Sequence, residues 1–180
     1  MRKETLNRFI RIRHFQESDI PLRVELMNDD RYMANVRDTA LSTGANELER
    51  WHLDVLNEHP RSTMLFTATT NKGQVLGFTW VYDIDWTGPS GQLSIAMFPR
   101  YRTGWGSLAI QATSALLFDE FGFQRITTQI FTHNTMMHSD EWTSERTDLL
   151  LPYFAFVSGR FCHSRIWTQS QEEYRLFSDT

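Results

Sequence analysis

The chain has 180 residues, a net charge of −4 and 41% hydrophobic residues, which is the composition of one soluble globular domain with a sizeable core. No apolar run reaches the length of a membrane span, and the first residues lack the apolar segment of a signal peptide. The single cysteine, Cys162, excludes an internal disulfide framework, and the negative charge argues against nucleic acid as a partner, so we expect one cytoplasmic domain over 1–180.

The first third of the chain is predicted to form a strand and helices. Alternating apolar and basic residues predict a strand over 9–15. Glu17-Ser18-Asp19 then open a helix of about ten residues, with Ser18 or Asp19 as its N-cap. The stretch 31–43 reads as a short helix followed by a loop, and 45–58 as a second clear helix.

An antiparallel meander is expected next. Strands are predicted over 62–69 and 74–86, and Asn71-Lys72-Gly73 between them is a hairpin turn of the kind that needs a positive φ. Thr87-Gly88-Pro89 then turns the chain into a central strand over 92–98.

The alternation along 74–86 predicts two different faces. One face carries Phe78, Trp80, Tyr82, Ile84 and Trp86, and the other carries Thr79, Val81, Asp83 and Asp85. The pattern fits either an aromatic face packed against the core with a solvated face opposite, or a strand that points Asp83 or Asp85 into a cleft. In a cleft, a carboxylate could hold a cationic amine or accept its proton.

The stretch 90–121 reads as an apolar strand, a short basic loop with two glycines, and a long amphipathic helix that begins near Ser107. Loop amides and the positive end of a helix dipole bind anions, and Gly104 and Gly106 allow a close backbone approach. Arg100 and Arg102 add positive charge. The alternative is a tight strand-to-helix turn with the arginines in solvent.

Gly122 ends that helix, and a further strand is predicted over 125–131. This β-loop-α-β order implies a parallel strand pair with a right-handed crossover. The segment 134–146 is polar and irregular. We expect a short helix with a kink at Pro152 over 147–154, and a closing hairpin of strands 156–167 and 172–177.

The order of these elements resembles the GCN5-related N-acetyltransferase (GNAT) superfamily, and within it the branch that acetylates ribosomal-protein N-termini. Four stretches carry the likeness: the opening strand and helix (10–20), the central strand and loop (91–106), the strand that ends in an Asn (122–134), and Ala155-Phe156 with the closing hairpin. The resemblance implies a GNAT fold: a mixed, mostly antiparallel sheet of about seven strands, with a splayed central strand pair and flanking helices.

The resemblance also implies acetyl-CoA, or another acyl-CoA, as co-substrate. In the family, the pantetheine arm lies between the splayed strands and pairs with strand backbone, here around Ile95, Ala96 and Met97. The remaining residues expected to bind the cofactor are Arg102, Thr103, Gly104, Trp105, Gly106, Ser107 and Asn134. The acceptor amine attacks the thioester directly, which requires a base for the ammonium and an acid for the thiolate.

The chain departs from the family pattern at the catalytic positions. Gln92 stands where the ribosomal branch has a Glu suited to be the base, and the position of the family's thiolate-protonating Tyr falls on Leu151. We therefore expect the catalytic roles to fall on Asp85, His138 and Tyr153, with Asp83 or a water relay as alternatives for the base. These departures favour a small or specialised amine over a ribosomal protein.

Two other groups of side chains give little support for a functional site. His133 and His138 lie near Asp140, but further zinc ligands at a set spacing are not evident, so no metal is expected. Neighbours on a strand point to opposite faces, so Cys162 and His163 do not form a nucleophile pair.

Two functions follow. The first is acyl transfer from acetyl-CoA to the amine of a small molecule or peptide, by a monomer or homodimer. The alternative is a GNAT-fold module that binds CoA or a ligand with little or no turnover.

Overall fold

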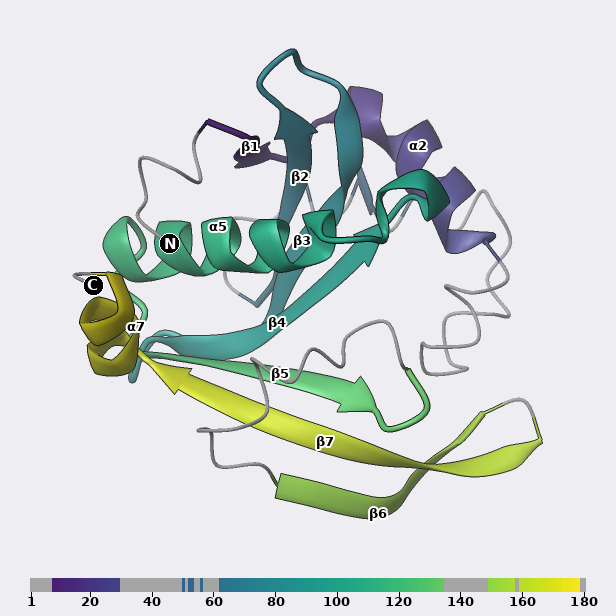
Figure 1. The fold of residues 1–180 in the computed structure, drawn as a ribbon, viewed down its shortest axis with the longest axis vertical. Coiled ribbons are helices and arrows are strands. Elements are labelled where there is room, and N and C mark those ends of the chain that lie inside the picture. The colour runs from purple at the N-terminus through teal and green to yellow at the C-terminus, as the bar shows by residue number, and fades with distance from the viewer. Residues whose placement is uncertain are drawn as a thin grey trace.

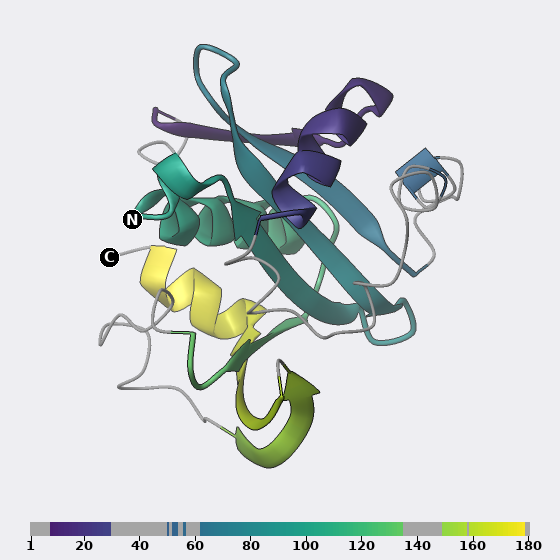
Figure 2. The same cartoon turned by 90° about the vertical axis from the view of Figure 1, so that its right-hand side faces the viewer.

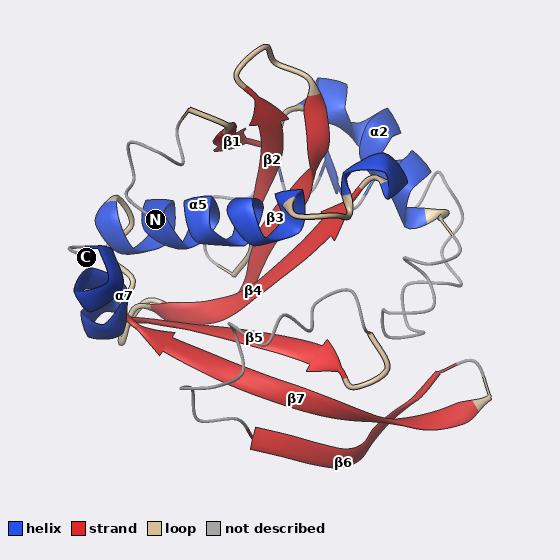
Figure 3. Ribbon diagram, in the orientation of Figure 1, coloured by secondary structure: helices blue, strands red, loops and turns tan. Residues whose placement is uncertain are grey.

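The computed structural model describes residues 8–29, 50, 52, 53, 56, 62–134, 149–157 and 159–178. Figure 1 shows the fold and Figure 3 its helices and strands. In chain order the elements are β1 (Ile10–His14), η1 (Glu17–Asp19), α2 (Ile20–Met27), β2 (Met64–Thr70), β3 (Val75–Asp85), β4 (Ser90–Met97), η3 (Pro99–Tyr101), α5 (Trp105–Asp119), β5 (Arg125–Phe131), β6 (Leu149–Val157), β7 (Arg160–Ser170) and α7 (Gln171–Ser178).

Seven strands form one sheet in the order β1-β2-β3-β4-β5-β7-β6. Every neighbouring pair is antiparallel except β4 and β5, which are parallel. The helix between β4 and β5 is α5, as the β-loop-α-β pattern predicts (Figure 1). The predicted fold class, a mixed and mostly antiparallel sheet with flanking helices, is confirmed.

Helices α5 and α2 cover opposite faces of the sheet (Figure 2). On one face, Ile110 and Leu117 of α5 pack with Leu93 of β4. On the other, Leu26 of α2 packs with Ala96 of the same strand. Side chains along β4 alternate between the two helices, so this central strand is buried on both faces. In the part of the chain described, no helix is long and apolar enough to cross a membrane.

A partly buried ion pair joins β1 to the start of the first helical segment. Arg13 donates to both carboxylate oxygens of Asp19, at 2.6 and 2.7 Å, and the Thr67 hydroxyl and the Gln16 amide also donate to this carboxylate. Burial by itself would raise the pKa of Asp19, but these hydrogen bonds, with the guanidinium charge, hold the pKa below its ordinary value.

Asp19→Asn is expected to lower the free energy of unfolding by about 2–3 kcal/mol at neutral pH, because it leaves the charged Arg13 guanidinium against a neutral group. The lowered pKa fixes the pH dependence. The stabilisation is complete above the unfolded pKa of about 4 and is lost as the pH falls through the folded value. Urea titrations of both proteins across acidic pH check this: the variant's deficit should shrink toward low pH, and a constant deficit would contradict it.

The predicted single face of Phe78, Trp80, Tyr82, Ile84 and Trp86 is wrong beyond Tyr82. Ile84 packs in the α5-side cluster, and the Trp86 ring meets Phe123 of that cluster at 5.7 Å. The register against β4 shifts between Tyr82 and Asp85, which is a β-bulge. The extra residue reverses the facing of every later side chain.

The expected helix over 147–154 is wrong, because this segment lies in strand β6. Pro152 is compatible with a strand here since β6 is at the sheet edge and its register against β7 shifts between Leu151 and Ala155. A proline removes one ladder donor, which an edge strand or bulge tolerates. The closing hairpin is therefore β6 and β7.

The expected last strand over 172–177 is also wrong, because it lies in helix α7. The helix forms here because Ser170 and Glu173 cap its N-terminus. The Glu173 amide donates to the Ser170 hydroxyl at 3.1 Å, and the Ser170 amide donates to the Glu173 carboxylate at 2.7 Å. This reciprocal pair is a capping box, and it starts a helix directly after β7.

The remaining predictions divide in two. The hairpin turn at Gly73 and the helix stop at Gly122 are confirmed, with φ of 81° and 67°. The four described residues of the predicted helix 45–58 are helical. The predicted stretch 31–43 lies outside the described residues, as does 134–146 apart from Asn134.

Candidate active site at the splayed central strands

Strands β4 and β5 pair over only three residues each. Ser90–Gln92 lie beside Arg125–Thr127, and no described residue of β4 beyond Gln92 pairs with β5. The two strands then diverge, as Figure 1 shows. We call the unpaired parts, Leu93–Met97 and Thr128–Phe131, the splay, and Gln92 with Thr127 its apex.

The backbone of β4 presents hydrogen-bonding groups to the splay. The Phe98 amide donates to the Leu76 carbonyl, so the even-numbered residues of β4 bond to β3. By the alternation of an antiparallel ladder, Leu93, Ile95 and Met97 direct their N–H and C=O groups away from β3, toward the splay. The predicted contacts at Ile95 and Met97 fit this geometry. Ala96, the third predicted residue, pairs its backbone with Phe78.

The N-terminus of α5 lies at the open end of the splay. Gly104 has a φ of 81° and precedes the first helical residue, Trp105. Among the described residues, no side chain caps this 15-residue helix, so its first amides are available to a ligand. Thr103, Gly104 and Ser107 are exposed. Free amides at the positive end of a helix dipole suit a phosphate group.

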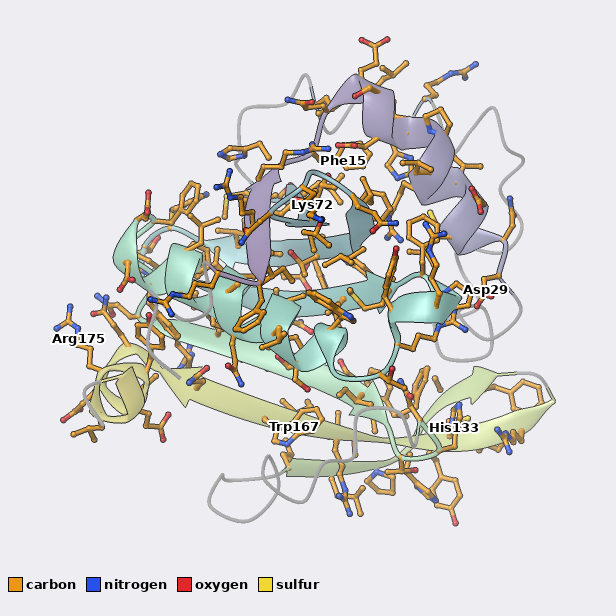
Figure 4. All side chains as sticks on the ribbon, turned by 45° about the horizontal axis from the view of Figure 1, so that its top comes forward. Phe15, Asp29, Lys72, His133, Trp167 and Arg175 are labelled. Carbon is orange, nitrogen blue, oxygen red and sulfur yellow. The ribbon has the colours of Figure 1, made fainter. Side chains whose placement is uncertain are left out.

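Arg102 connects this loop to α2. Its Nε donates to the Met97 carbonyl at 3.3 Å, and its guanidinium forms an ion pair with Asp29. Figure 4 labels Asp29 at the end of α2, close to the loop that follows β4. The side chain of Arg102 is 11% exposed. It holds the loop in place, so a direct contact of its guanidinium with a pyrophosphate stays a prediction.

Three side chains meet at the apex. The Tyr82 hydroxyl donates to Gln92 Oε1 at 3.1 Å, and Gln92 Nε2 donates to an Asp83 carboxylate oxygen at 3.1 Å. Asp83 is exposed and has a φ of 52°, which is unusual for a residue with a side chain. It is part of the bulge in β3, and the bulge brings its carboxylate to the face that carries Tyr82 and Gln92.

Asp85 has different surroundings. It lies where β3 ends, and its carboxylate accepts the Thr87 amide at 2.8 Å. That amide, with further donors in the same turn, lowers the pKa of Asp85. A carboxylate with a lowered pKa is a weaker base, so its predicted catalytic role gains nothing from the geometry.

Tyr153 lies in the irregular part of β6. Its amide donates to Nδ1 of His163 at 3.1 Å, the centroids of the two rings lie 5.0 Å apart, and the residue is 70% exposed. Asn134 follows β5 and donates its amide to the Phe131 carbonyl at 3.0 Å. Because β4 and β5 are parallel, Asn134 and the N-terminus of α5 belong to the same, open end of the splay.

His138 lies outside the described residues, as does Asp140, the other residue of the possible metal site beside His133. Within the ranges described, no three His, Cys, Asp or Glu side chains form a group that could hold a metal ion. His133 stacks on Phe131 at 5.4 Å, and Figure 4 labels it near the β6–β7 hairpin.

Sequence reasoning missed the contact of Arg102 with Asp29 and the cluster of Tyr82, Asp83 and Gln92. A charge pair that joins residues far apart in the chain has no local signal. The bulge at Asp83 also has none, because an alternating strand pattern continues through it.

The comparisons with known proteins agree with this geometry. A family model described as the acetyltransferase (GNAT) domain matches residues 10–139. No curated protein matches the sequence.

Solved structures of the same fold are similar at low identity. Spermidine N-acetyltransferase from Vibrio cholerae, in complex with CoA and spermine, has a TM-score of 0.81 at 15% identity, covering 92% of this chain and 98% of that chain. The spermidine/spermine N-acetyltransferase SpeG from the same organism, in complex with manganese ions, has a TM-score of 0.78 at 16% identity, covering 96% and 99%. Such identities establish the fold, and the family match establishes the rest: this chain belongs to the GNAT acetyltransferase family and is an N-acetyltransferase.

Proposed function

We propose that this protein transfers the acetyl group of acetyl-CoA to the amine of a small molecule or peptide by direct attack of the amine. One observation carries the proposal: the central strands β4 and β5 part after three paired residues, and the uncapped N-terminus of α5 lies at their open end. An extended arm that ends in a pyrophosphate needs those two features side by side.

The residues present fit acetyl-CoA. Backbone groups of Ile95 and Met97 would pair with the pantetheine amides, with Ala96 between them. The amides from Arg102 to Ser107, including Thr103, Gly104, Trp105 and Gly106, would hold the pyrophosphate, with Asn134 at the same end. When bound, the cofactor supplies an activated acetyl thioester.

We also propose which side chains act as the base and the acid of the reaction. Asp83, Asp85 or His138 would take the proton of the ammonium, and Tyr153 would protonate the thiolate. Small aliphatic polyamines are acceptors to test first, since the structural neighbours are spermidine and spermine acetyltransferases. The sequence resembles the branch that acetylates ribosomal-protein N-termini, but Gln92 and Leu151 at its catalytic positions favour a small or specialised amine over a ribosomal protein. We expect a single domain over 1–180, active as a monomer or homodimer.

A thermal shift with acetyl-CoA, free CoA and longer acyl-CoAs tests the cofactor. A ligand that binds only the folded state at about 100 times its Kd stabilises the protein by about 2.7 kcal/mol, which raises the Tm by about 5–10 °C for a chain of this size. No shift with any of them, in a folded sample, would contradict the proposal.

Release of free CoA thiol, with spermidine, spermine and a dipeptide as acceptors, tests the transfer. Acetylated product identified by mass spectrometry supports the proposal and names the acceptor class. A clear thermal shift with no acceptor acetylated would favour the alternative, a module of this fold that binds CoA without efficient transfer.

A further inference from the structure

The apex of the splay carries a carboxylate in an unusual position. Asp83 is an exposed residue with a φ of 52°, a left-handed conformation that costs free energy for a residue other than glycine. This backbone conformation is part of a β-bulge, which shifts the register of β3 against β4 between Tyr82 and Asp85. Bulges next to active sites re-aim single side chains, and this one changes the face to which Asp83 points.

The re-aimed carboxylate is held by neighbours of the apex. Gln92 is the last residue of β4 that pairs with β5, and its Nε2 donates to Asp83 at 3.1 Å. Its Oε1 accepts the Tyr82 hydroxyl at 3.1 Å, which fixes which end of the amide faces Asp83. The chain thus orients one oxygen of an exposed carboxylate and leaves the group accessible from solvent.

The expected path of the cofactor would bring its thioester close to Asp83. With the pyrophosphate at the N-terminus of α5, the pantetheine arm would run along β4 from the open end of the splay toward the apex. The reactive thioester is at the far end of that arm, so it would lie near Gln92. A proton acceptor for an attacking amine is needed at that place, and the Asp83 carboxylate, hydrogen-bonded to Gln92, lies there.

From these observations we infer that Asp83 is the catalytic base of the reaction, with Gln92 as its positioning residue. This inference rests on the proposed function. The Asp83 carboxylate takes one proton from the acceptor ammonium, and the nitrogen lone pair forms a C–N bond with the thioester carbon. The C–S bond breaks with its electron pair on sulfur. The second proton leaves the new amide nitrogen and neutralises the thiolate as CoA-SH, and Asp83 returns its proton to solvent.

Asp85 is the competing carboxylate, two residues away. It accepts amides within its own turn, and these hydrogen bonds lower its pKa. The donor to Asp83 that the structure shows is a neutral side-chain amide, which leaves the second carboxylate oxygen for a substrate.

The test compares Asp83→Asn with the parent enzyme, using acetyl-CoA with spermidine, spermine or a dipeptide. Asparagine tolerates a positive φ and can still accept the Gln92 amide, so the fold should persist. At about pH 7 we expect kcat/KM for the amine to fall about 100-fold, the usual contribution of a general base. Affinity for acetyl-CoA and the Tm should stay unchanged. Glu172→Gln, an equal charge change on exposed helix α7, should stay within about twofold.

Two readouts separate a base from a structural role. An aliphatic amine has a pKa of about 10, so its neutral fraction rises about tenfold per pH unit below that value, and the deficit of Asp83→Asn should narrow accordingly. In addition, calorimetry of spermidine binding to the complex with free CoA, where no transfer occurs, should show weaker binding by up to about fivefold when the Asp83 charge is lost.

Gln92→Leu probes the positioning residue. Removing the amide frees Asp83 to adopt other rotamers, so kcat should fall by about tenfold while KM for acetyl-CoA stays the same.

Four results would overturn the assignment. Parent-like kcat/KM in Asp83→Asn would exclude the base, as would a deficit that does not change with pH. A large loss in Asp85→Asn with none in Asp83→Asn would move the role to Asp85. If the parent protein binds acetyl-CoA but acetylates none of the amines, the proposed function itself fails, and the assignment of a base fails with it.

Discussion

Gly77→Ala is expected to lower the free energy of unfolding by about 3 kcal/mol or more, because the new methyl group would overlap the neighbouring strand. An alanine Cβ at this position would lie 2.3 Å from the Ala96 carbonyl oxygen and 2.7 Å from Met97 Cα. Both atoms belong to the backbone of β4, which cannot move without breaking its pairing with β3. Urea denaturation measures the effect.

The same substitution should also reach the cofactor. Gly77 pairs with Met97, whose backbone groups face the splay, so a displaced β4 would weaken acetyl-CoA binding as well as stability. Gly88→Ala is the matched control. No atom lies within 4 Å of the place that an alanine Cβ would take there, so stability should change by at most about 0.5 kcal/mol. Equal effects of the two alanines would contradict the account of the close approach.

Ser107→Glu is expected to weaken acetyl-CoA binding by about 100-fold and to leave the fold intact. Ser107 is exposed in the first turn of α5, beside the amides proposed to hold the pyrophosphate. Two like charges about 4 Å apart near a surface repel by about 4 kcal/mol, of which salt screens a part. A negative charge in the first turn of a helix interacts favourably with the helix dipole, so the Tm of the protein without ligand should stay the same or rise slightly.

Ser107→Gln introduces a side chain of the same size as glutamate but without its charge. It should lower the affinity for acetyl-CoA by less than about fivefold. Calorimetry at low and high ionic strength separates the two effects, because only the charge-dependent loss shrinks with added salt. Equal losses in both variants, unaffected by salt, would mean that the pyrophosphate does not lie at this helix terminus.

The sequence contained most of the fold because its signals are local. The alternation of β1 to β4, the positive φ at Gly73 and the glycine stop at Gly122 each act within a few residues, and the structure confirms them. The parallel pairing of β4 and β5 followed from the connection through α5.

The two wrong elements are at the C-terminal end. Three leucines before Pro152 suit a helix or a strand, and pairing with β7 at the sheet edge settles the choice. The prediction of a strand after Ser170 neglects the spacing of Ser170 and Glu173, which is that of a capping box. The first error therefore needs the tertiary context to correct it, whereas the second has its correction in the sequence itself.

The candidate site was predictable for the cofactor and less so for the catalytic groups. A glycine-containing loop between a strand and a helix is a local pattern, so the loop proposed to bind the pyrophosphate could be located before the structure. The base could not, because a bulge decides which carboxylate reaches the apex. Asp83 and Asp85 are equivalent in a regular strand, and only the register shift makes them differ.

Hydrogen exchange with and without acetyl-CoA tests the central claim most directly, namely that the cofactor lies between β4 and β5 with its pyrophosphate on α5. The account predicts slower exchange at the amides of Ile95 and Met97 and in the first turn of α5, with β1 and β2 unchanged. Protection confined to other elements, while calorimetry shows that acetyl-CoA is bound, would contradict it.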